Sequence, residues 1–199
     1  MRWLDYTTSS EAFMTSRLLA FSLVLLWNTP LLAAPKEEVS KPLKTVINAV
    51  RYKRDALALK NFAGEEQGKF LLGEDWAKGT DAQRKEFVSL FHALFAKLAF
   101  PKIQSNFEHL DAVLYEEPAV KEDRAEMGST ILINHPMKKQ ELKVKYKLLK
   151  EKAGWKVIDV SVLGDSMLTG IRDDQIIPIM KEGGWEHLLE LMKEKLAEK

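Results

Sequence analysis

The clearest candidate for a catalytic residue is Ser166, which follows Gly164 and Asp165 in a short segment near the end of the chain. A serine hydroxyl becomes an effective nucleophile when a neighbouring base takes its proton and a third group orients that base. The only histidine after Ser166 is His187, and the residue three positions before it is Gly184. The same serine can instead cap a helix at a strand-to-helix turn. We favour the helix cap.

The segment 163–170 also resembles the nucleophile block of the GDSL esterases and lipases. In that family the serine follows the first strand, and its histidine lies three residues after an aspartate. Here only 33 residues follow Ser166, and no aspartate stands at the matching position before His187. An esterase that uses Ser166 therefore stays an alternative hypothesis, and we expect no catalytic residue.

The sequence gives little support for a metal, cofactor or nucleic-acid site. The four histidines stand at unrelated spacings, none of them in an HExxH pattern. The chain has no cysteine, which excludes disulfides and thiolate metal sites. Its net charge is +1, with basic and acidic residues interspersed, unlike the clustered basic surface of a nucleic-acid binder. We expect no metal and no cofactor.

Residues 1–34 have the order of a cleavable signal peptide. Arg17 precedes an apolar run over 18–27, and Ala33 and Ala34 precede Pro35. The run is shorter than the roughly 20 apolar residues that a membrane-spanning helix needs. Because Met14 gives an ordinary signal start, we interpret it as the true initiator. The mature protein is then exported and soluble, with a flexible lead-in over 35–41 and a single domain over 42–199.

The elements follow from hydrophobic periodicity. Helical spacing begins near Pro42, and Thr80 with Gln83 predicts a capped helix that Pro101 ends. Alternation then predicts strands over 111–115, 125–133, 142–148 and 155–162, joined by short turns. Helical patterns return over 167–180 and from Trp185 onward. Short connections favour antiparallel pairing, and segregated helices and strands indicate an α+β fold with helices covering the sheet.

Residues 154–167 are similar to the signature of the MlaC family, also called the toluene-tolerance auxiliary proteins. The pattern is carried by Gly154-Trp155, Asp159, Gly164 and Ser166. Residues 179–189 and the region from Trp76 to Phe91 resemble the family as well. The resemblance implies a curved four-stranded antiparallel sheet, a nuclear-transport-factor-like cone, that encloses an apolar cavity with its helices.

The resemblance also implies a function. It implies a periplasmic phospholipid carrier that shuttles lipid between an outer-membrane lipoprotein complex and an inner-membrane ABC transporter complex. The lipid species stays open, either a phospholipid or a polycyclic lipid such as a hopanoid. A periplasmic adaptor with no ligand, whose apolar face is merely core, is a further alternative.

A lipid carrier must enclose acyl chains. Each methylene contributes about 0.8 kcal/mol, so two chains of ~15 methylenes amount to ~24 kcal/mol. The candidate lining residues from the strands are Val113, Ile131, Ile133, Val144, Tyr146, Leu148, Val160 and Val162. Those from the helices are Phe91, Leu94, Met167 and Leu168. This choice depends on strand register, because a shift of one residue turns every side chain to the other face.

The first testable prediction concerns processing. We expect cleavage within a residue or two of Ala34, because small residues there follow the apolar run. N-terminal sequencing of the exported protein measures this directly. An uncleaved chain in the membrane fraction would contradict the prediction.

Overall fold

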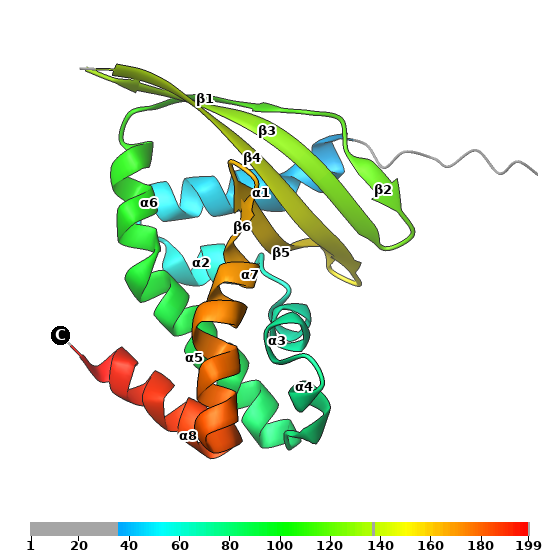
Figure 1. Ribbon diagram of the computed structural model, residues 1–199. Helices are drawn as coiled ribbons and strands as arrows, with labels where there is room; N and C mark the ends of the chain where they lie inside the picture. The colour runs from blue at the N-terminus through cyan, green and yellow to red at the C-terminus, as the bar shows by residue number, and fades with distance from the viewer. Residues whose placement is uncertain (1–35, 137, 199) are drawn as a thin grey trace, which may run out of the picture. The chain divides into compact units, whose positions relative to one another are not determined.

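The computed structural model describes residues 36–136 and 138–198, which begin with helices (Figure 1). These are α1 (Lys36–Arg51), α2 (Asp55–Leu59), α3 (Gly64–Leu72), α4 (Asp75–Lys78), α5 (Asp81–Leu98) and α6 (Phe100–Phe107). The predicted capping box at the start of α5 is confirmed: the Gln83 amide donates to the Thr80 hydroxyl (3.2 Å), and the Thr80 amide donates to the Gln83 side chain (2.8 Å). The cap therefore fixes where α5, the longest of these six helices, begins.

An antiparallel sheet follows, as predicted. Its strands are β1 (Leu110–Tyr115), β2 (Ala119–Lys121), β3 (Arg124–His135), β4 (Lys138–Glu151), β5 (Gly154–Val162) and β6 (Asp165–Ser166). Their order is β1-β3-β4-β5-β6, and β2 pairs with β3 beside β1. The predicted count of four strands was wrong, because the two- and three-residue strands β6 and β2 are too short to show alternation. The α+β class is confirmed, and the cone stays a prediction.

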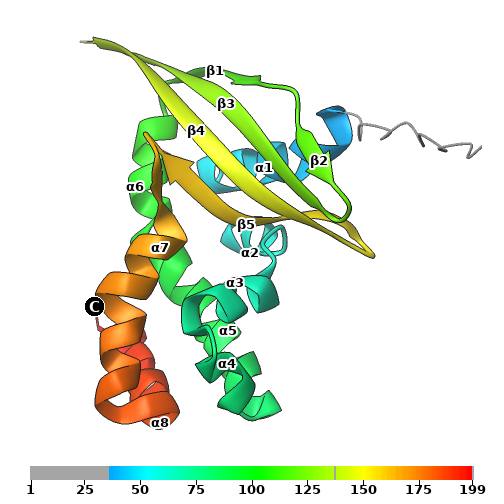
Figure 2. The same cartoon turned by 45° about the vertical axis from the view of Figure 1, so that its right-hand side comes forward.

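The chain ends with α7 (Met167–Ile171), the π-helix η1 (Arg172–Ile176) and α8 (Ile177–Ala197). Gly184 interrupts α8 with φ 66° and ψ −155°, so α8 consists of two arms. Both arms are visible in Figure 2, the first in orange and the second in red.

Helix α1 lies against the apolar face of the sheet (Figures 1 and 2). Val39, Leu43, Ile47 and Val50 recur every three or four residues on its buried face. The predicted flexible lead-in was therefore wrong for residues 36–41, which are helical and already bury Val39. Proline favours the first turn of a helix but is disfavoured further in, which made Pro42 a misleading start signal.

Helices α2 and α6 add Ala58, Phe100 and Phe107 to this cluster between α1 and the sheet, whereas the other helices form a second core. A register shift between β4 and β5 leaves Ile158 without a partner on β4, and Val157 and Ile158 belong to different apolar clusters. The sheet is tied to the helices there, because the buried Gln67 side chain donates to the Ile158 carbonyl (2.8 Å) and pairs with His92 (2.9 Å). Burial lowers the pKa of His92, which favours its neutral form.

None of the helices within the described residues is long and apolar enough to cross a membrane. The predicted signal peptide over 1–34 and the proposed start at Met14 lie outside the described residues.

The second prediction tests whether the sheet face is solid core. Val144 is 4% exposed in the cluster with α1. Val144→Asp buries an unpaired charge there and should lower the free energy of unfolding by more than about 3 kcal/mol. Urea denaturation measures the change.

Lys143→Asp is the matched control, because Lys143 is exposed on the neighbouring position of β4. It should change stability by less than about 0.5 kcal/mol. A Val144→Asp protein as stable as this control would show that the sheet face is hydrated rather than packed.

Candidate functional site

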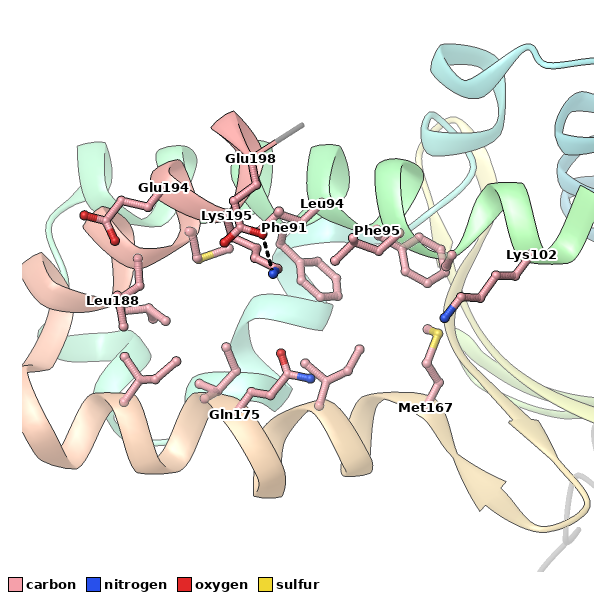
Figure 3. A pocket seen from close by; sticks show the side chains of 17 residues that line it. Phe91, Leu94, Phe95, Lys102, Met167, Gln175, Leu188, Glu194, Lys195 and Glu198 are labelled. Carbon is pink, nitrogen blue, oxygen red and sulfur yellow. Dashed lines mark hydrogen bonds and ion pairs between the residues drawn. The ribbon is translucent and has the colours of Figure 1, made fainter.

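The second core contains an apolar cavity of about 570 Å³ between α5 on one side and α7, η1 and α8 on the other (Figure 3). This volume lies within the roughly 300–1,000 Å³ that is usual for small-molecule sites. The cavity is open at its edge and its walls are predominantly aliphatic and aromatic. It therefore suits a ligand with a large apolar part.

Helix α5 supplies one wall. The stripe predicted from its three-and-four spacing turns Phe91, Leu94, Phe95 and Leu98 toward the cavity. The rings of Phe91 and Phe95 stack with centroids 6.3 Å apart. Behind them, the buried Phe87 stacks on Phe91 with centroids 6.0 Å apart. Stacked rings hold this wall in one arrangement.

The opposite wall is one nearly continuous helical run. Met167 of α7 and Ile176 of η1 line the cavity, as does Ile179 of the first arm of α8. The second arm returns after Gly184 and adds Leu188 and Met192. Two arms of one helix thus face the same space.

A few polar side chains lie among these apolar ones. Lys102 and Gln175 line the cavity, and Lys195 is paired there with Glu198. Beside them, the Lys97 ammonium donates to the backbone carbonyls of Lys195 (3.3 Å), Leu196 (2.8 Å) and Glu198. One α5 lysine therefore satisfies carbonyls that the end of α8 leaves without helical partners.

Ser166 caps α7, as predicted. Its hydroxyl accepts from the Thr169 amide (3.1 Å) and donates to the Asp159 carboxylate (2.6 Å). Asp159 also accepts from the backbone amides of Val160 (2.8 Å) and Leu168 (3.1 Å). Both hydrogen-bonding roles of the hydroxyl are thus used at the start of a helix. Over residues 36–136 and 138–198, no three acidic, histidine or cysteine side chains are grouped to hold a metal ion.

A second hollow of about 410 Å³ lies between α3 and the sheet, and charged residues make up a larger share of its lining. Three of its charged side chains pair with one another: Glu66 with Arg124 (2.6 Å) and with Lys69 (3.0 Å). The hydrogen bond from Arg124 is the main cause of the lowered pKa of Glu66. Glu66, Arg124 and Lys69 are therefore engaged with one another rather than directed at an open space.

The structure divides the predicted lining residues. Phe91, Leu94 and Met167 line the cavity, whereas Leu168 is fully buried beside it. The strand residues do not reach this cavity. Ile131, Ile133, Val144, Tyr146 and Leu148 are buried in the sheet cluster with α1, and Val113 and Val160 pack half-buried against it. Val162 is 37% exposed.

Sequence reasoning missed most of the wall opposite α5. The spacing of Ile171, Gln175 and Ile179 would have found one row, and that of Leu188, Leu191 and Lys195 another. The π-helix lies within the first row and the break at Gly184 separates the two rows, which makes the pattern hard to recognise as one face.

A model of the MlaC protein family matches residues 37–194 of this sequence. The chain belongs to the MlaC family. A similar solved structure is that of the phospholipid-binding protein from Ralstonia solanacearum in complex with a phospholipid, with a TM-score of 0.66 and 17% identity. The alignment covers 81% of this chain and 96% of the Ralstonia protein. The sequence matches no curated protein. This MlaC-family chain therefore shares its fold with a protein that has been solved with a lipid.

The third prediction tests Ser166 in this MlaC-family chain. Ser166→Ala removes the cap of α7 and should lower the free energy of unfolding by about 1 kcal/mol. Ser166→Thr keeps a hydroxyl and should therefore lower the free energy of unfolding by less than Ser166→Ala does. If the wild type hydrolysed short-chain esters and Ser166→Ala abolished that activity, Ser166 would be a nucleophile.

Proposed function

We propose that this protein is a periplasmic lipid carrier that encloses the acyl part of a phospholipid. The observation that carries the proposal is the open, largely apolar cavity in its helical core, in a fold shared with a phospholipid-bound protein. Family membership and the predicted signal peptide support a periplasmic location. The carrier shuttles lipid between an outer-membrane lipoprotein complex and an inner-membrane ABC transporter complex.

Acyl chains require such an enclosure. A chain of ~15 methylenes gains about 12 kcal/mol on leaving water at 0.8 kcal/mol for each group. If a methylene occupies about the 30 Å³ of a water molecule, the cavity of about 570 Å³ holds about 19 of them. The cavity as it stands therefore suits one acyl chain.

A second chain needs additional space, and the apolar layer between the sheet and α1 can supply it. In that expanded state, lipid would contact the predicted strand residues Ile131, Ile133, Val144, Tyr146 and Leu148. The edge of the enlarged cavity would be formed by Val113, Val160 and Val162. The cone-like sheet and helices implied by the family would enclose the lipid in this way. Core side chains would then exchange contacts with one another for contacts with lipid, at little loss of apolar burial.

The fourth prediction tests the cavity. Leu94→Trp places a larger ring in the space between α5 and α8 and should reduce the lipid that copurifies with the protein by more than about half, because overpacking competes with the ligand. Mass spectrometry of the extracted lipid measures this, and the melting temperature shows whether the variant is folded.

Leu114→Trp is the matched control, since Leu114 is 56% exposed on β1 and does not line the cavity. It should leave the lipid content unchanged. Wild-type protein that never carries lipid would refute the carrier function. Unchanged lipid in a folded Leu94→Trp protein would place the lipid elsewhere.

A further inference from the structure

The polar groups of the cavity lie in a definite order. Figure 3 shows Lys102 beside Met167 at one end, with its ammonium directed toward the cavity, and Glu194 beside Leu188 at the other end. Gln175 lies between them. The cavity therefore has a basic end, an amide in the middle and an acidic end.

Lys102 differs from the neighbouring lysines in having its charge available. Lys195 is paired with Glu198, and Lys97 donates to the last carbonyls of α8. In the part of the chain that the structure describes, no carboxylate forms an ion pair with Lys102. An unpaired ammonium at the edge of an apolar cavity is a suitable contact for a phosphate.

Gln175 interrupts an apolar row. Ile171 and Ile179, one turn before and one turn after it, both line the cavity. Figure 3 shows the Gln175 amide extending from its helix into the space, and no hydrogen bond to it is found among residues 36–136 and 138–198. The amide can donate to an ester carbonyl, which in a glycerolipid lies between the phosphate and the acyl chain.

We propose that Lys102 binds the phosphate of a glycerophospholipid and that Gln175 donates a hydrogen bond to an ester carbonyl, so that the acyl chain extends toward Leu188. This assignment rests on the proposed carrier function and names its headgroup site. The order of groups in the cavity matches the order in the lipid. Glu194 disfavours the reverse orientation, because it would place a carboxylate near the phosphate.

The test uses the mature, delipidated chain and two probes with identical acyl chains: phosphatidylglycerol, and diacylglycerol, which lacks the phosphate. The wild type should prefer phosphatidylglycerol, and Lys102→Gln should reduce that preference by about fivefold, near the upper limit for an exposed charge pair. Lys102→Arg should retain it. Lys181→Gln is the matched control, because Lys181 is an exposed lysine of α8 that does not line the cavity.

Gln175 is tested separately with ester-linked and ether-linked phosphatidylglycerol. Gln175→Leu should remove the preference for the ester form, since an ether oxygen is a weaker acceptor than a carbonyl. Retention of that preference in a folded Gln175→Leu protein would overturn the role given to Gln175.

Three results would overturn the headgroup assignment and can be told apart. Lipid binding by the wild type with no phosphate preference, unchanged by Lys102→Gln, would leave the carrier function but refute the site. A Lys102-dependent shift in melting temperature with inorganic phosphate alone would make it a site for free anions. Failure of the wild type to bind either lipid would refute the carrier function itself.

Discussion

The buried carboxylate of Asp159 joins the two halves of the domain. Asp159 is 4% exposed at the end of the register shift in β5, and it accepts hydrogen bonds from Val160, Ser166 and Leu168. A buried carboxylate is tolerated only when its oxygens are satisfied in this way. The same hydrogen bonds fix the first turn of α7 against the sheet. They thereby determine that Met167 faces the cavity while Leu168 is buried behind it.

The layer between the sheet and α1 is closely packed, whereas the helical layer contains the cavity. Helix α1 covers the apolar face of the sheet together with side chains of α2 and α6, and its buried side chains pack with those of β3, β4 and β5. In the helical layer, α5 faces two arms of α8 that diverge from one turn. Helices that diverge cannot keep ridges and grooves in contact along their whole length. The cavity lies in this layer.

The sequence identified elements well and lining residues less well. Capping residues and periodicity are local, so Thr80, Ser166 and the apolar stripe of α5 could be recognised directly. Whether an apolar side chain meets another side chain or an open space depends on distant packing, so Val144 and Leu94 look alike in sequence. The predicted start of α1 at Pro42 was too late. The residues before Pro42 are mostly charged, and the few that α1 buries, such as Val39, do not stand out.

The wall opposite α5 depends on Gly184. Its φ of 66° and ψ of −155° belong to a region that essentially only glycine occupies, which allows α8 to reverse within one residue. Trp185 then anchors the reversal: its indole donates to the Asp75 carbonyl (3.0 Å), and its ring packs edge-on against Phe87 (6.1 Å). These contacts hold the turn between the two arms of α8 against α4 and α5. Because the turn sends the second arm back along the same space, both arms line one cavity, with Ile179 from the first arm and Leu188 and Met192 from the second.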